Sequence, residues 1–146
     1  MQFDGTRSLQ GDRRQVWRAL NDPTVLQACV PGCETFTAKD DGTYELVIVA
    51  VVGPVKSRMS GILGLKDVVM NESYTLEFEF QGGMAGFGKG ALYVTLDDEP
   101  GGCLLRYSAE TKVGGRIAQL GSRLIEGAAK KLSDMFFERF AQAVSP

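Results

Sequence analysis

The sequence has 146 residues, which is enough for one domain that buries its own hydrophobic core. Its 16 lysines and arginines nearly balance its 18 aspartates and glutamates, and no basic stripe stands out, which argues against a nucleic-acid-binding protein. The chain has no histidine, so the most common general base and every histidine-ligated metal site are excluded.

The sequence has three cysteines, Cys29, Cys33 and Cys103, and its N-terminus does not resemble a secretory signal. An odd number of cysteines without such a signal argues against a disulfide framework. Cys29 and Cys33 have a spacing that could suit a metal, but a closed zinc site needs four ligands, and we expect no metal. The longest uninterrupted apolar run, Leu46 to Val52, is far shorter than the ~20 residues of a membrane-spanning helix. We therefore expect one cytoplasmic domain over residues 1–146.

The N-terminal part predicts a strand followed by two short helices. Residues 3–9 alternate loosely and are typical of a strand. Asp12 is a suitable N-cap for a helix over 13–20, and Pro23 favours the start of a second short helix that continues over 24–29.

The middle of the chain alternates apolar and polar residues with the period of β-strands. The predicted strands span 33–39, 44–52, 55–65, 73–81, 93–96 and 105–113. Asp41-Gly42 and Gly53-Pro54 provide tight turns between them. Because consecutive strands usually pair, we expect an antiparallel meander with one apolar face.

Residues 116–143 predict one long helix of ~40 Å that could cover this apolar face. At 100° per residue, Phe137 falls on its charged side, where an exposed phenylalanine would suit contact with a partner or membrane. The helix end could also bury it. A glycine-rich sheet that curves around a single helix is expected to leave an apolar cavity.

The segment from Gly83 to Lys89 matches most of the sequence motif of a phosphate-binding loop. Gly90 stands where that motif needs serine or threonine, and a strand rather than a helix follows, so we expect a hairpin over the cavity mouth with Phe87 as a candidate gate. No nucleophile signature occurs, and Glu77 and Glu79 suit a solvated strand face. We expect no catalytic residues.

The candidate ligand-binding residues are apolar side chains of the predicted inner sheet face, the hairpin and the long helix, because ligand pockets are mostly apolar. The same side chains are equally consistent with a filled core. They are Leu46, Ile48, Met59, Leu63, Leu76, Phe78, Phe80, Phe87, Tyr107, Leu124, Ala128, Leu132 and Phe136.

Charge is uneven along the chain. Residues 116–146 hold five basic and three acidic side chains, whereas the rest of the chain is acidic. Basic helices favour an acidic partner or an anionic membrane surface. An alternative interpretation is therefore a ligand-free interaction module that docks a partner through these helices.

Several segments along nearly the whole chain resemble the CoxG family of carbon monoxide dehydrogenase accessory proteins, within the START-like helix-grip superfamily. The resemblance is carried by Val16–Pro23, Cys29–Glu34, Val52–Lys56, Gly86–Gly90, Val113–Gly115, Gln119–Ile125 and Phe136–Phe140. It implies an α+β helix-grip fold, in which a curved seven-stranded antiparallel sheet wraps around the C-terminal helix.

The resemblance also implies a function. Family members look like accessory proteins that help recruit a molybdenum-containing carbon monoxide dehydrogenase or related hydroxylase to the inner face of the cytoplasmic membrane. They are linked to binding a hydrophobic molecule such as a quinone or lipid, with no other cofactor. Many members carry a further C-terminal tail, which this sequence does not show after Pro146, so we expect the cavity to be the stronger functional element. An enzyme of the aromatase or cyclase kind, as found elsewhere in the superfamily, is not favoured, because this chain has no histidine.

Overall fold

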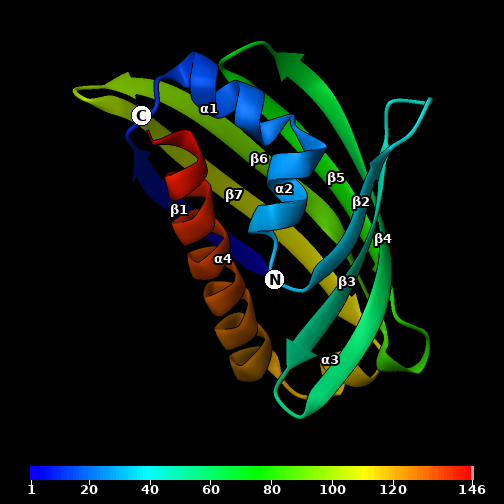
Figure 1. Cartoon of the computed structure of the whole chain (residues 1–146). Helices are drawn as coiled ribbons and strands as arrows, with labels where there is room; N and C mark the ends of the chain where they lie inside the picture. The colour runs from blue at the N-terminus through cyan, green and yellow to red at the C-terminus, as the bar shows by residue number, and fades with distance from the viewer. Residues whose placement is uncertain (146) are drawn as a thin grey trace.

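The computed structural model describes residues 1–145 and contains one antiparallel sheet of seven strands in the order β1-β7-β6-β5-β4-β3-β2 (Figure 1). The predicted meander is confirmed: strands β2 to β7 pair in succession, and β1 pairs with β7 at the other end. The strands are β1 (Gln2–Leu9), β2 (Cys33–Ala38), β3 (Tyr44–Val52), β4 (Val55–Val69), β5 (Ser73–Gln81), β6 (Phe87–Glu99) and β7 (Gly102–Gly114).

Two short helices, α1 (Arg13–Leu20) and α2 (Pro23–Cys29), follow β1, as predicted. Asp12 caps α1 because its Oδ1 accepts a hydrogen bond from the Gln15 backbone N–H at 2.8 Å, while Gln15 Oε1 accepts one from the Asp12 N–H. A cap of this kind stabilises a helix by about 1 kcal/mol.

The C-terminal segment forms two helices, α3 (Arg116–Gln119) and α4 (Ser122–Val144), so the prediction of one continuous helix over 116–143 was wrong. Gly121 separates them with a φ of 92°, a left-handed conformation that a glycine adopts without steric cost. The sheet curves around α4, which gives it a concave face toward the helix and a convex face away from it (Figure 1).

Strand register explains why the concave face is apolar. Leu63 on β4 lies between Tyr44 on β3 and Phe78 on β5, and Leu76 on β5 lies opposite Leu92 on β6. Because side chains alternate between faces, the polar residues of the same strands point to the convex side.

The packed core lies at the end of the sheet where α1 and α2 meet the C-terminal half of α4. Val16, Cys103 and Phe140 are fully buried there, and Leu105 is nearly so. A smaller cluster around Met59 and Ile117 lies at the other end, near α3. Two sides of the molecule are thus closed by packing, and the space under the first half of α4 lies between them.

The strand predicted over 93–96 begins earlier, because β6 starts at Phe87 within the glycine-rich segment. Gly90 permits this because a Cβ at that position would collide with the Glu110 carbonyl of β7. Strand β4 also runs past residue 65 to Val69, with Asp67 at a φ of 54° where the pairing with β5 shifts.

Candidate functional site: the apolar face beneath the long helix

The two halves of α4 cover the sheet very differently. Phe140 in the C-terminal half has no exposed surface, whereas Leu124 and Leu132 toward the N-terminal half are each 43 % exposed. An apolar side chain that stays accessible on a helix above an apolar sheet face marks incomplete packing. The N-terminal half of α4 therefore covers the sheet loosely.

Aromatic side chains fasten the C-terminal half. Phe137 stacks on Tyr107 of β7 with ring centroids 5.6 Å apart, and Phe136 stacks on Phe140 at 5.5 Å. The helical wheel left two positions open for Phe137, exposed on the charged side or buried by the helix end. Phe137 is half-buried, because its ring stacks on Tyr107 and has Arg7 of β1 beside it.

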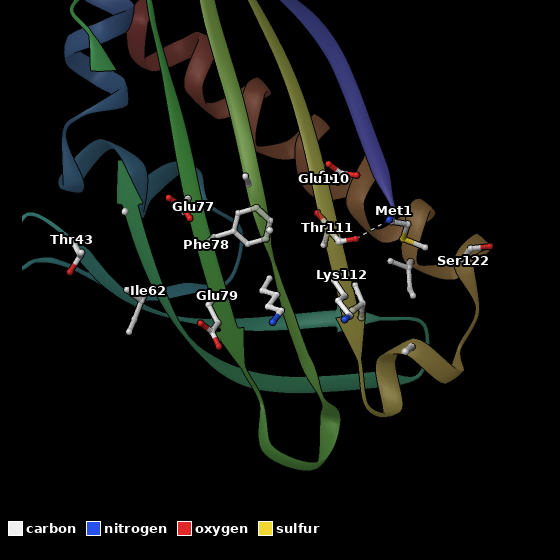
Figure 2. A pocket seen from close by; sticks show the side chains of 17 residues that line it. Met1, Thr43, Ile62, Glu77, Phe78, Glu79, Glu110, Thr111, Lys112 and Ser122 are labelled. Atoms are coloured by element: carbon white, nitrogen blue, oxygen red, sulfur yellow. Dashed lines mark hydrogen bonds between the residues drawn. The ribbon is translucent and has the colours of Figure 1, made fainter. Parts of the chain in front are cut away.

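A hollow of about 1170 Å³ lies along β5, β6 and β7 and reaches α3 and the start of α4 (Figure 2). Its lining comes from both faces of the sheet. Phe78, Thr111 and Val113 belong to the concave face and adjoin Ser122 and Ile125 of α4.

The charged side chains of this lining all lie on the convex face. In the strand register, Glu79 lies opposite Lys89, and Lys89 lies opposite Lys112. Glu77 and Glu110 lie on either side of Ala91. The concave part contributes apolar groups, the hydroxyl groups of Thr111 and Ser122, and at its β1 edge Met1, whose amino group donates to the Thr111 carbonyl. The space under α4 is thus mostly apolar with few polar groups, as small-molecule sites usually are.

Several predicted ligand-binding residues come together on the concave face of β3, β4 and β5. Leu46 and Leu63 are buried beside Phe36, with Ile48, Leu76, Phe78 and Phe80 packed against them. Met59 is buried in the cluster near α3, which also contacts Ile48 and Phe80. Of these residues, Phe78 borders the hollow.

The remaining predicted residues are spread more widely. Tyr107 and Phe136 pack against the main core, Ala128 is half-buried, and Leu124 and Leu132 are exposed on α4. The register puts Phe87 on the face opposite Phe80 and Gly88, over Gly114.

Sequence reasoning missed Thr111, Val113, Ser122 and Ile125 as lining residues. Thr111 and Val113 share the alternation of Tyr107, so the sequence carried a signal for them. Ser122 could not be singled out because it was expected inside a continuous helix.

The cysteines provide no reactive centre. Burial raises the pKa of Cys29 and Cys33, and it raises the pKa of Cys103 to about 11, so the thiolate form is scarce at neutral pH. Residues 1–145 contain no group of three or more histidine, cysteine, aspartate or glutamate residues placed to hold a metal ion.

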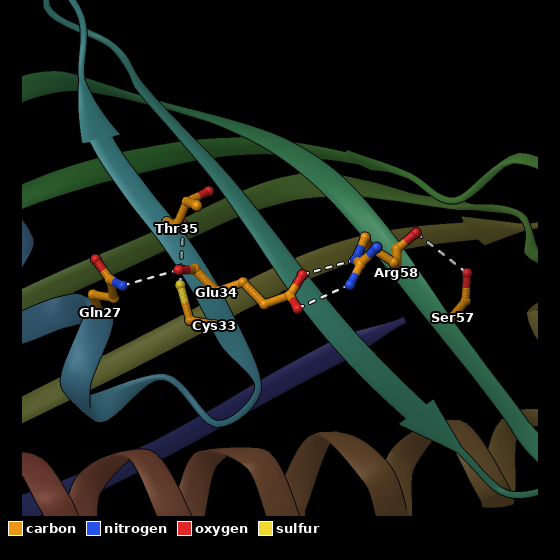
Figure 3. Close-up of polar contacts among 6 residues, drawn as sticks. All are labelled: Gln27, Cys33, Glu34, Thr35, Ser57 and Arg58. Atoms are coloured by element: carbon orange, nitrogen blue, oxygen red, sulfur yellow. Dashed lines mark hydrogen bonds and ion pairs between the residues drawn. The ribbon is translucent and has the colours of Figure 1, made fainter.

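An ion pair on the convex side holds the opposite edge of the sheet in place (Figure 3). Arg58 of β4 donates two hydrogen bonds to the Glu34 carboxylate, from Nε at 2.7 Å and from Nη2 at 3.0 Å. Gln27 of α2 donates to the Glu34 backbone carbonyl at 3.0 Å. These contacts link β2, β4 and α2 across β3 at the edge of the sheet opposite β1.

A second hollow, of about 430 Å³, lies at the α3 end of the molecule and is lined by Lys56, Met84 and Arg116 among others. Met84 is 86 % exposed there. Leu124 lies close to Gly53 of the adjacent β3–β4 turn. Exposed apolar side chains and cations thus lie together at the α3 end of the molecule.

No helix in the described part of the chain is both long enough and apolar enough to cross a bilayer.

A long helix packed in a curved antiparallel sheet, with two short helices after the first strand, is the arrangement of the START-like fold. A START superfamily protein from Mycobacterium smegmatis has the same fold, with a TM-score of 0.73 at 11 % identity, covering 98 % of this chain and 96 % of that one. A conserved protein from Geobacillus kaustophilus is 28 % identical, with a TM-score of 0.89 over 99 % of this chain and 95 % of that chain. No curated protein matches the sequence.

Within this class, the family model of CoxG, a subunit of carbon monoxide dehydrogenase, matches residues 5–145, so the chain belongs to that family. The resemblance inferred from the sequence is confirmed, and so is the helix-grip fold that it implied.

Proposed function

We propose that this protein binds a neutral, mostly apolar molecule, of the quinone or lipid kind, between α4 and the concave face of the sheet. The observation that carries the proposal is the apolar sheet face beneath the loosely packed half of α4, where Leu124 and Leu132 remain exposed. Covering such surface with an apolar ligand is favourable by ~25 cal/mol for each Å² removed from water.

The neutrality of the ligand follows from where the charges lie. Glu77, Glu79 and Lys89 face away from α4, whereas Thr111 and Ser122 bring hydroxyl groups to the inner part of the hollow. A charged head group buried there without a partner would cost several kcal/mol. A carbonyl or hydroxyl group could instead exchange hydrogen bonds with the two hydroxyls.

The family supports the wider role. As a CoxG protein it would serve as an accessory component of a molybdenum-containing carbon monoxide dehydrogenase-type enzyme and help couple that enzyme to the membrane. The α3 end of the molecule suits the membrane side, because Lys56 and Arg116 surround the exposed Met84. Each cation near an anionic bilayer contributes ~1 kcal/mol.

Native mass spectrometry with added decylubiquinone, and with palmitate as the charged comparison, tests the ligand. We expect uptake of about one quinone per chain and much weaker uptake of palmitate. Phe78→Asp should abolish quinone uptake because it places a carboxylate in the apolar space. Tyr93→Asp is the matched control, since Tyr93 is half exposed on the convex face and lines neither hollow, so its variant should bind normally.

A wild-type protein that takes up no quinone and releases no lipid on organic extraction would contradict the proposal. The ligand-free interaction module would then account for the family role.

A further inference from the structure

The β4–β5 hairpin carries an exposed apolar tip at the end of the molecule opposite α3. Val68, Val69 and Met70 follow one another there and are 51 %, 47 % and 74 % exposed. Three consecutive accessible apolar residues are uncommon on a monomeric surface and indicate a contact site.

The tip has a fixed shape. The Glu72 backbone N–H donates to the Val69 carbonyl at 2.9 Å and closes the turn, and the Leu96 N–H of β6 donates to the Glu72 carbonyl at 2.8 Å. Arg13 of α1 contacts Glu72 at 3.9 Å and Asp98 at 2.9 Å. Its neighbours therefore hold the hairpin against α1 and β6, so the apolar residues need little further ordering on binding.

Carboxylates flank these apolar residues in the sequence and lie at the end of the adjacent strand. Asp67 and Glu72 flank the tip in the sequence, and Asp97, Asp98 and Glu99 end the neighbouring strand β6. Arg13 pairs with Glu72 and Asp98, and Arg106 pairs with Asp97. The acidic groups outnumber the cations that pair with them.

We infer that Val68, Val69 and Met70 form a docking surface for a protein that presents an apolar pocket with a basic rim, and that this surface is where the accessory protein contacts its enzyme. The second part of the inference rests on the proposed function. An anionic bilayer is disfavoured as the occupant because the carboxylates around the tip would be repelled by it. The two apolar ends of the molecule thus suit different surfaces: the cationic α3 end a membrane, and the acidic hairpin tip a protein.

Binding to a purified molybdenum-containing carbon monoxide dehydrogenase from the same organism, measured by biolayer interferometry, tests the inference. The double variant Val69→Ser with Met70→Ser should lose at least about tenfold in affinity, because truncating an exposed anchor commonly costs more than 1 kcal/mol. Asp67→Asn removes one carboxylate and keeps a side chain that tolerates the left-handed backbone. It should weaken binding to the enzyme and make that binding less dependent on salt.

Met84→Ser is the matched control, since it removes a still more exposed methionine from the opposite end. It should bind the enzyme as the wild type does and bind phosphatidylglycerol vesicles less well. The tip variants should show the reverse pattern. Decylubiquinone uptake by every variant verifies that it is folded.

If the tip variants bind the enzyme with wild-type affinity, the docking surface is elsewhere and the inference fails, while the proposed function stands. If they lose vesicle binding instead, the tip is a membrane contact; if they change the sedimentation of the protein alone, it is a contact between copies. Either result overturns the inference. A wild-type protein that does not bind the enzyme overturns the partner in the proposed function as well.

Discussion

Arg7 of β1 donates a hydrogen bond from Nη2 to Oδ1 of Asp134 on α4, at 2.8 Å, and thereby joins the edge of the sheet to the middle of the long helix. The Arg7 guanidinium also lies 4.9 Å from the centre of the Phe137 ring. On the N-terminal side of this contact the helix covers the sheet loosely, and on the C-terminal side it is packed. The pair marks the boundary between the loosely covering and the packed parts of α4.

Arg7→Met should loosen this fastening while keeping an apolar stem against Phe137. We expect the free energy of unfolding to fall by about 1 kcal/mol, since a partly exposed cation–aromatic contact and a surface ion pair each contribute up to that amount. Bound decylubiquinone should dissociate faster, as stopped-flow fluorescence would show. Lys130→Met serves as control because Lys130 contacts Asp134 from within α4. Equal dissociation rates in Arg7→Met and the wild type would show that this contact does not affect ligand release.

The pH dependence of stability should reveal the same carboxylate. The hydrogen bond from Lys130, with further contributions from the charges of Lys130 and Arg7, holds the pKa of Asp134 below its usual value of 3.8. A lowered native pKa stabilises the fold fully above pH 3.8, and the effect is lost as the pH falls through the native pKa. Urea unfolding between pH 5 and 2 should thus show a shallower acid loss for Asp134→Asn than for the wild type. Parallel curves for the two proteins would mean that Asp134 does not contribute.

The two halves of α4 should respond differently to truncation. Phe140→Ala should cost about 3–5 kcal/mol because the side chain is wholly buried. Leu132→Ala should cost less than about 1 kcal/mol and should mainly reduce ligand affinity, because Leu132 is 43 % exposed. Chemical denaturation and quinone titration of both variants check this. A large loss of stability in Leu132→Ala would show that the N-terminal half is packed in solution.

Two glycines of β6 provide a matched pair. Gly90→Ala should destabilise the protein by about 1–3 kcal/mol, since the added methyl group meets the Glu110 carbonyl, whereas a methyl group at Gly88 meets no atom within 4 Å. Gly88→Ala is therefore expected to be neutral or slightly stabilising, because alanine reduces the freedom of the unfolded chain. Thermal unfolding of the two variants gives the comparison, and equal midpoints would contradict the close approach of β6 and β7.

The strands could be predicted because alternation determines which face each residue takes. The concave face holds the alternating apolar residues of β5, as their spacing indicates: Tyr74, Leu76, Phe78 and Phe80. The N-cap at Asp12 was also predicted from the sequence. Local patterns did not reveal the break at Gly121, since a single glycine is tolerated within a helical pattern.

Parts of the candidate site were beyond a sequence-based prediction because they depend on tertiary contacts. The position of Phe137 depends on Tyr107, which lies on a strand far away in the sequence. The looseness of the first half of α4 depends on how far the sheet curves, and no local pattern encodes that curvature.

The pairing of β1 with β7 also bears on how the chain folds. The Met1 amino group donates to the Thr111 carbonyl across 110 positions of sequence, and Gln2 lies opposite Glu110. During synthesis, the first strand must therefore wait without a partner until almost the whole chain has left the ribosome. Pairings of such long range are slow to form because loop closure costs entropy before the contact is made. We therefore expect the zipping of β1 onto β7 to be a late step in folding, and β1 to be the segment that most needs protection from aggregation until then.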